Sequence, residues 1–234
     1  AERILEAMIA ADFGDAEAHW NRAIGRLARG LPGAGWPEFE WRWRLPNVGV
    51  PSVPPAPEWN NCPLRSRRLW LWPEQESGDQ ILFASMLPDL LARGAQLTVE
   101  CDPRLHALFA RSFPGACFVA VRANRHEIEP GICDFQLPLG SLARHLRADL
   151  EDFPKRSSYL VADADERARW AAWLNGLGPG MKVGICWRSH DQHGERRLAC
   201  AALEQWPPLL RCARVRFVCL QYDDCEAELE ALRA

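Results

Sequence analysis

The stretch RLWLWPEQESGDQILFASMLP, residues 68–88, decides the fold of this chain. The apolar residues Leu69 to Trp72 predict a buried strand, the polar residues Glu74 to Asp79 predict a turn, and a helix is expected to open at Asp79. In such a unit the N–H groups of the turn and a carboxylate face one crevice, which suits a polar ligand. The sequence therefore predicts a functional site at this turn.

The composition is that of an ordinary globular protein. Its 234 residues suit one or two domains, and a hydrophobic share of 48% is enough for a proper core. A formal net charge of -3 lacks the basic excess of proteins that follow phosphate backbones, so we expect no nucleic-acid partner. No apolar run approaches the ~20 residues that span a bilayer, and the charged, amphipathic N-terminus is unlike a signal peptide. The sequence therefore predicts a cytoplasmic protein without a transmembrane segment.

The nine cysteines are scattered along the chain, and no two have the C-x-x-C spacing of a metal or redox motif. Several of them alternate with apolar residues in strand-like runs. This distribution favours reduced, buried thiols over a disulfide framework or a zinc site.

Residues 1–45 predict a helical segment. Helices are expected at 1–11, at 16–29 with Asp15 as the N-cap, and at 35–44. This succession predicts a helical-hairpin arrangement at the start of the chain.

The helical segment repeats its pattern of small and large side chains at an offset of 34 residues. Ala23 and Gly30 fall where a helical hairpin needs close approach. The pattern resembles the tetratricopeptide repeat and departs from it at Arg22 and Arg42, where that repeat usually has an apolar or small residue. Since repeats need neighbours to bury their faces, we expect further repeats to precede this one in a longer protein.

An aromatic row closes the helical segment, and it has two interpretations. The favoured one is a face that packs the last repeat on the next domain, and the alternative is a binding platform. Residues 46–67 contain six prolines and no periodicity, so they predict a semi-rigid connection and a domain boundary. The aromatic row consists of Trp36, Phe39, Trp41 and Trp43.

From Arg68 onward, short apolar strands alternate with helices, which predicts a parallel sheet covered on both faces. We assign a Rossmann-like domain to residues 68–162 on this pattern. Strands are expected at 69–72, 96–101, 117–121 and 133–137. Helices are expected at 79–93, 103–112 and 139–146.

A second series of elements begins after a crossing segment and a helix at 163–174. Two strands and two helices follow, which is too little for an independent doubly wound domain. Residues 163–234 therefore either extend the first sheet or open a second domain. The strands are expected at 183–187 and 216–221, and the helices at 200–211 and 225–232.

Six stretches of the chain carry a resemblance to a known family. They are GWPEFEWRWR, PEWNNCPL, WLWPEQESGDQILFASMLPDLLARG, VECDPRL, KVGICWRS and RFVCLQYDDCEAEL. Their order and spacing resemble those of bacterial tetratricopeptide-repeat glycosyltransferases related to the ADP-heptose:lipopolysaccharide heptosyltransferases.

The resemblance implies a GT-B fold, in which two Rossmann-like domains face a cleft. The acceptor would bind the N-terminal domain, and the nucleotide-sugar donor would bind mainly the C-terminal domain. This chain would then supply the repeat segment, the N-terminal domain and only the beginning of the donor domain, so we expect it to be truncated at both ends.

The resemblance also assigns a candidate catalytic base. Inverting sugar transfer needs a base for the acceptor hydroxyl and groups that stabilise the departing diphosphate. In the family the base candidate is the aspartate of a Gly-Asp pair after the first strand, which is Gly78-Asp79 here. Asp79 also suits a structural role as the N-cap of the following helix, and both roles stay open. Gln75, Ser77 and Gly78 would line the acceptor-side loop.

This loop departs from the family at two positions. Members usually carry EQGLGD or EQGIGD, whereas this chain has EQESGD, with Glu76 and Ser77 in place of a glycine and an apolar residue. The side chain of Glu76 would narrow the crevice, and it would strain a turn that required positive φ.

A polar loop, WRSHDQHGERR, occupies residues 187–197 after the first strand of the second series. Ligands bind at the carboxyl edge of the sheet in such folds. By the resemblance, a serine and an arginine of this loop would contact the donor phosphates, because hydroxyl and guanidinium groups suit diphosphate oxygens. The alternative is a solvated charged loop. The residues concerned are Arg188, Ser189, Arg196 and Arg197.

The same region offers no metal or cofactor motif. His190 and His193 lack a third ligand at a suitable spacing, so we expect no metal. By the resemblance, the chemistry needs no cofactor, since the nucleotide sugar is itself the substrate. Gln221, Tyr222 and Asp223 either line the same cleft or form a strand-terminal turn.

Two functions of different classes follow from these patterns. The leading hypothesis is a metal-independent, inverting glycosyltransferase that moves a sugar from a nucleotide donor to a glycan, lipid or protein acceptor held near the repeats. The alternative is a repeat-bearing protein-interaction module whose α/β part is a degenerate, non-catalytic scaffold. A dinucleotide-dependent oxidoreductase is excluded, because no G-x-G-x-x-G follows any expected strand.

Overall fold

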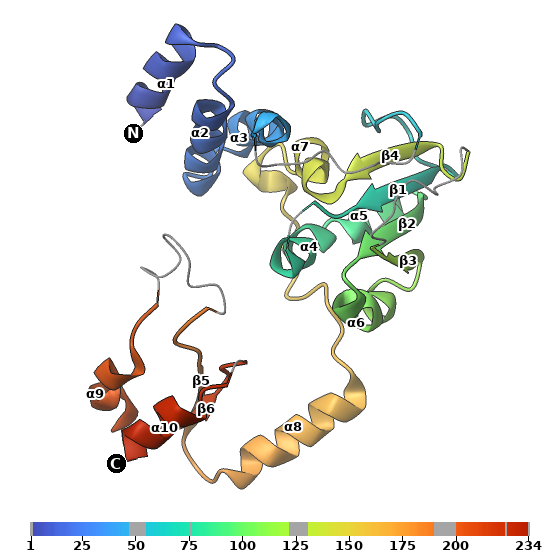
Figure 1. The fold of residues 1–234 in the computed structure, drawn as a ribbon. Coiled ribbons are helices and arrows are strands. Elements are labelled where there is room, and N and C mark those ends of the chain that lie inside the picture. Colours follow the sequence, from blue (N-terminus) through green and yellow to red (C-terminus); the bar gives the residue numbers. More distant parts are fainter. Residues whose placement is uncertain are drawn as a thin grey trace. The chain divides into compact units, whose positions relative to one another are not determined.

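The structure is a computed structural model and describes residues 2–46, 55–74, 76–121, 131–189, 200–222 and 224–233. It is a mixed α/β chain with a parallel sheet, which confirms the predicted fold class at this level (Figure 1). The chain divides into two compact units, Ala1–Ala162 and Asp163–Ala234.

The first unit opens with helices. The carboxylate of Asp15 accepts a hydrogen bond from the N–H of Ala18 at 2.9 Å, so the predicted N-cap is confirmed. The third helix begins at Pro32, earlier than predicted, because the fixed φ of proline suits the first turn of a helix. The elements are α1 (Glu2–Ala11), α2 (Ala16–Ala28), α3 (Pro32–Phe39) and the 3-10 helix η1 (Glu40–Arg44).

Helices α2 and α3 form a closely packed hairpin. Ala23 is fully buried, and a Cβ on Gly35 would lie 2.6 Å from the side chain of Leu27. Gly30 has a different role from the predicted close approach, since its φ of 72° ends α2 in the left-handed conformation that glycine adopts readily. The hairpin therefore needs small residues at Ala23 and Gly35 and a flexible backbone at Gly30.

The rest of the first unit is built on a four-stranded parallel sheet in the order β3-β2-β1-β4 (Figure 1). Leu69 of β1 is level with Leu97 of β2 on one side and with Phe135 of β4 on the other. Each strand lies close to its predicted position, because buried parallel strands are unbroken apolar runs. The strands are β1 (Arg68–Trp72), β2 (Gln96–Cys101), β3 (Ala116–Ala120) and β4 (Phe135–Pro138).

The helix predicted at 79–93 is wrong in two respects. It starts earlier, at Ser77, and it is interrupted after Ala84, because Pro88 has no N–H to continue the helix and fits the first turn of a new one. The helices of this part are α4 (Ser77–Ala84), α5 (Leu87–Ala92), η2 (Pro103–Leu105), α6 (His106–Ser112), η4 (Leu139–Leu142), α7 (Ala143–Leu146) and η5 (Leu150–Asp152).

The two faces of the sheet are covered differently. Leu71 of β1 belongs to a core that it shares with residues of α4, α5, α6 and α7. Trp70 and Trp72 alternate to the other face and form a separate cluster with Trp43 and Ala56. In the described part of the chain, indole rings and the segment around Ala56 cover this second face in place of helices.

The Pro-rich segment that we predicted as a connection is bound to the sheet where it is described. The N–H of Trp59 donates to the carbonyl of Gln136 at 3.0 Å, and the N–H of Gln136 donates to the carbonyl of Pro57 at 3.0 Å, beside β4. Trp59 and Leu64 are buried. This part of the segment is therefore an edge of the domain.

The aromatic row after α3 packs the helices against the sheet. The rings of Trp36 and Phe39 each lie 6.4 Å from the ring of Phe83 in α4, edge to face. The ring of Trp43 lies 5.3 Å from that of Trp72 in β1. The predicted packing face is thus confirmed for three of its four aromatic residues.

The second unit has its own two-stranded parallel sheet, in which Met181 is level with Val215. Of the two alternatives, the extension of the first sheet is therefore excluded, and a separate unit agrees with the structure. Its elements are α8 (Ala164–Gly176), β5 (Met181–Ile185), η7 (Leu203–Gln205), α9 (Pro207–Leu210), β6 (Val215–Cys219) and α10 (Glu226–Arg233).

All nine cysteines are free, but only some are buried, so the expectation of buried thiols is correct in part. Within the described residues, no helix combines the length and the apolar character needed to cross a bilayer. The buried cysteines are Cys101 and Cys133, and the exposed ones are Cys117, Cys186, Cys212 and Cys219.

Candidate functional site

The sheet of the first unit has a topological switch at its carboxyl edge. The connections lead from β1 to β2 on one side, and the chain later returns to β4 on the other side of β1. In open parallel sheets, ligands bind outside the carboxyl ends of the strands where connections diverge in this way. The residues that follow β1 and β4 are therefore the candidates for function, namely Glu74 to Asp79 after β1 and Ser141 after β4.

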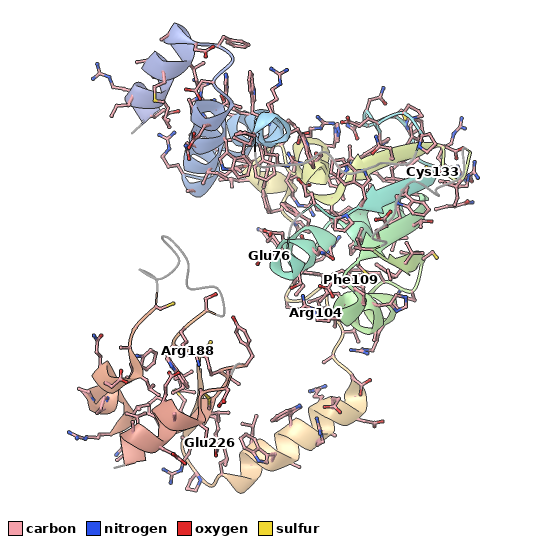
Figure 2. All side chains as sticks on the ribbon, viewed as in Figure 1. Glu76, Arg104, Phe109, Cys133, Arg188 and Glu226 are labelled. Carbon is pink, nitrogen blue, oxygen red and sulfur yellow. The ribbon has the colours of Figure 1, made fainter. Side chains whose placement is uncertain are left out.

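The turn between β1 and α4 is the predicted acceptor-side loop. Glu76 has φ -66° and ψ 171°, which is ordinary extended backbone, so the strain expected at a positive φ does not arise. Its side chain is exposed at the start of α4 (Figure 2). Ser77 is half-buried, and no heavy atom lies within 4 Å of the position of a Cβ on Gly78. The loop is therefore open at Gly78, and Gln75 lies outside the described residues.

Asp79 is the third residue of α4, so the prediction that it is the N-cap is wrong. Its carboxylate accepts hydrogen bonds from its own N–H and from that of Glu76, and it caps the helix from within the first turn, as in a capping box. Burial and the charge of Glu76 raise the pKa of Asp79, and the hydrogen bonds offset this only in part. A carboxylate with a raised pKa is a better proton acceptor near neutral pH.

Arg42 fills the space at the switch point. Its side chain is 2% exposed and reaches from η1 to the ends of β1 and β4. Its Nη2 donates to Glu74 Oε1 at 3.0 Å and to Ser141 Oγ at 2.8 Å, and its Nε also binds Glu74. Its Nη1 donates to Glu40 Oε1 at 2.9 Å. The helical segment thus places a buried charge where α/β sheets usually hold a ligand.

Glu74 is enclosed by the residues around it. Its side chain is 4% exposed, and its Oε1 accepts the N–H of Gly140 at 2.8 Å in addition to the bonds from Arg42. A Cβ on Gly140 would lie 2.5 Å from this oxygen, so only glycine permits the approach. Burial raises the pKa of Glu74, and Arg42 offsets the effect only in part. Glu74 therefore anchors the helical segment.

We did not predict this cluster, although the sequence contains a signal for it. Arg42 occupies a position at which the repeat pattern usually has an apolar or small residue. Its guanidinium carbon lies 4.4 Å from the ring centroids of both Phe39 and Trp43, within the range of cation–π attraction. The sequence signal for this buried cation is an arginine among aromatic residues, with Glu40 two positions before it.

Arg188 in the second unit is held by its own neighbours. Its Nε donates to Glu228 Oε1 at 2.9 Å, and its Nη2 donates to the carbonyl of Asp224 at 2.7 Å. Gln221 accepts the N–H of Arg188 at 3.3 Å and donates to its carbonyl at 3.1 Å. Figure 2 labels Arg188 in this unit. A phosphate ligand would have to replace Glu228 at the guanidinium.

The other residues of the predicted donor loop are only partly described. The N–H of Ser189 donates to the Sγ of Cys200 at 3.4 Å. The described residues contain no group of three or more His, Cys, Asp or Glu side chains placed to hold a metal ion. Besides Gln75, the predicted site residues outside the described ranges are Arg196 and Arg197. The histidines that we expect not to bind a metal, His190 and His193, and the cleft candidate Asp223 lie outside these ranges too.

Comparison with known proteins gives one similarity. No model of a protein family matches the chain, and no solved structure matches it. Among curated proteins, the chain is similar to Protein FlbA of Caulobacter vibrioides, with 36% identity over 226 residues. The similarity covers 89% of this chain and 37% of the relative, so the chain spans little more than a third of the relative's length.

Proposed function

We propose that this chain is part of a GT-B glycosyltransferase, in which the first unit binds the acceptor and the second unit begins the donor domain. The observation that carries the proposal is Asp79, a half-buried carboxylate with a raised pKa in the first turn after the central strand. It lies next to Gly78, which leaves the loop open toward solvent. The resemblance of the six sequence stretches supports the same assignment.

In the proposed reaction Asp79 takes the proton of an acceptor hydroxyl while that oxygen attacks the anomeric carbon of the sugar. The attack occurs opposite the leaving nucleoside diphosphate, so the configuration inverts. Ser77 and Gly78 position the acceptor at the loop. Positive charge and hydroxyl groups of the second unit balance the departing phosphates without a metal ion. These residues are Arg188, Ser189, Arg196 and Arg197.

The proposed acceptor is a glycan, lipid or protein that the helical segment helps to hold. The packing of Trp36 and Phe39 on α4 supports this role, because it fixes the helices to the element that carries Asp79. An acceptor bound on the helices would therefore stay at a constant position relative to the candidate base.

Turnover of nucleotide sugars by the purified chain tests the proposal. We expect one member of a panel that includes ADP-heptose, UDP-sugars and GDP-sugars to release its nucleoside diphosphate. Asp79→Asn is expected to slow this release by ~10²–10⁴-fold, the usual contribution of a general base, while donor binding measured by calorimetry stays the same. Equal turnover in the variant and the wild type would remove Asp79 from the mechanism.

Asp102→Asn is the matched control for this experiment. It makes the same chemical change at the end of the neighbouring strand, where the Asp102 carboxylate caps η2 by accepting the N–H of Arg104 at 2.8 Å. Asparagine caps a helix as well as aspartate does, so the control is expected to keep both stability and turnover.

The filled switch point favours a second candidate function. Arg42 and Glu74 occupy the space at the carboxyl ends of β1 and β4 with a buried ion pair. In this second proposal the sheet is a scaffold that presents the helical segment to a protein partner. The two proposals separate in the turnover assay: a chain that is folded by circular dichroism but neither binds nor hydrolyses any donor of the panel favours the scaffold.

A further inference from the structure

Two thiols of the second unit lie in contact across a short loop. The Sγ of Cys219, the last residue of β6, lies 3.9 Å from the Sγ of Cys225, which directly precedes α10. Both cysteines are free, and Cys219 is exposed whereas Cys225 is half-buried. In a disulfide bond the two sulfurs lie ~2 Å apart, so these thiols must approach further before they bond.

The loop between these thiols holds Arg188. Gln221 in the loop binds the backbone N–H and carbonyl of Arg188 at 3.3 and 3.1 Å. The carbonyl of Asp224 accepts a hydrogen bond from the guanidinium at 2.7 Å. A covalent bond between the two thiols would close this loop at both ends and so restrict the residues that position Arg188.

We propose that Cys219 and Cys225 form a redox-active dithiol that closes to a disulfide with a low-molecular-weight disulfide such as oxidised glutathione. One thiolate attacks a sulfur of oxidised glutathione, breaks its S–S bond and releases one glutathione. The other thiolate attacks the protein sulfur of the mixed disulfide and releases the second glutathione. The two protons pass to the released thiols, the protein loses two electrons and the glutathione disulfide gains them.

Two other cysteines of the second unit, Cys186 and Cys200, have different contacts from this pair. The Sγ of Cys186 lies 3.4 Å from Gln221 Oε1, and the Sγ of Cys200 accepts the N–H of Ser189 at 3.4 Å. These thiols contact oxygen or nitrogen, whereas Cys219 and Cys225 contact each other's sulfur. The test of this pair does not depend on the proposed sugar transfer, because disulfide formation is measured by the mass of the peptides and not by turnover.

The test treats the purified full chain with oxidised glutathione and maps the products by mass spectrometry. Trypsin places Cys219 and Cys225 together in one peptide, residues 217–233, apart from the other cysteines. The mass of this peptide is expected to fall by that of two hydrogens when the disulfide forms. Further cleavage before Asp224 is expected to leave its two halves linked by the disulfide.

Serine variants complete the test. In Cys219→Ser and in Cys225→Ser, the remaining thiol of the pair is expected to stop at the mixed disulfide with glutathione. Cys212→Ser changes an exposed thiol elsewhere in the unit and is expected to give the same linked peptide as the wild type. The proposal is overturned if both thiols of the wild type stay as mixed disulfides, if neither reacts, or if either bonds to a third cysteine.

Discussion

Arg42 joins three segments of the first unit through one buried side chain. It comes from η1, binds Glu74 after β1 and Ser141 after β4, and lies over the rings of Phe39 and Trp43. Burying a guanidinium is costly, and the fold tolerates it because each of its nitrogens meets an acceptor. The position of the helical segment against the sheet therefore depends strongly on this residue.

Arg42→Met is expected to lower the free energy of unfolding by ~3 kcal/mol or more, because it leaves the buried charge of Glu74 without a partner. Urea unfolding followed by tryptophan fluorescence measures the change. Adding Glu74→Gln is expected to restore part of the loss, since it removes the stranded charge. Arg104→Met is the control, because the ion pair of Arg104 with Asp102 lies at the surface. The urea midpoint of this variant should hardly differ from that of the wild type. Equal losses in Arg42→Met and the control would contradict the role of Arg42.

The α2–α3 hairpin combines a buried ion-pair cluster with close helix packing. Glu38 of α3 is 8% exposed and accepts hydrogen bonds at 2.9 Å from Arg22 Nε and from Arg26 Nη1. The Nδ1 of His19 lies 2.6 Å from the same carboxylate, and its ring stacks on Trp41 with 3.7 Å between centroids. This cluster explains why Arg22 departs from the repeat pattern. It also explains why Trp41 faces the hairpin.

The stability provided by Glu38 is expected to depend on pH. Burial raises the pKa of Glu38, but the hydrogen bonds from Arg22 and His19 and the charge of Arg26 outweigh it, so the pKa is lowered. Because the pKa is lowered, the carboxylate contributes its full stability at pH values above the pKa of the unfolded chain, which is near 4.5. This contribution is lost as the pH falls through the lower pKa of the folded chain. Glu38→Gln should therefore destabilise the chain at neutral pH, with a smaller difference in acid.

Urea unfolding at neutral and acid pH measures this difference. Glu17→Gln, at an exposed position of α2, is the control and should show little change at either pH. A difference between Glu38→Gln and the wild type that stays constant with pH would contradict the assigned direction of the pKa shift.

Two glycines of the hairpin provide a matched pair of variants. No heavy atom lies within 4 Å of a Cβ added to Gly25 in α2, whereas one added to Gly35 in α3 meets Leu27 at 2.6 Å. Both alanine substitutions gain helix propensity of about 1 kcal/mol, but Gly35→Ala also displaces Leu27, which costs ~1–3 kcal/mol. Thermal unfolding should shift upward for Gly25→Ala and downward for Gly35→Ala. An upward shift for both would mean that the hairpin is loosely packed.

The elements of the first sheet were predictable from the sequence, and several boundaries were not. Apolar runs locate the strands because parallel strands are buried on both faces. The break before Pro88 was missed, since helical periodicity continues through it while the missing N–H interrupts the hydrogen bonds. The loop at Glu76 was expected to suffer from the absence of glycine, but its backbone is extended and needs none.

At the scale of the whole molecule, the two units bury their apolar residues to different degrees. In the first, the helical segment, the Pro-rich segment and the sheet contribute to one core. In the second, Trp170, Trp173 and Leu220 are exposed and line a hollow of about 430 Å³. Exposed apolar surface of this kind is typical of an interaction site.

The candidate site was predictable only where it follows directly from one strand, turn and helix. Asp79 was located by that local pattern, whereas the contact of Arg42 with Ser141 joins residues 99 positions apart and depends on tertiary packing. The pairing of Arg188 with Glu228 is similarly remote in sequence. Local patterns thus identify the residues that reach the sheet edge, and packing decides which of them stay available to a ligand.

The central claim is that Asp79 acts as the base of a sugar transfer, and the pH dependence of kcat/KM for nucleotide-sugar turnover tests it most directly. Because only the deprotonated carboxylate accepts a proton, we predict that the rate rises with pH through the raised pKa of Asp79 and then levels off. Asp79→Asn should be slow and lack this rise. An Asp79→Asn variant with the rate and pH profile of the wild type would contradict the claim.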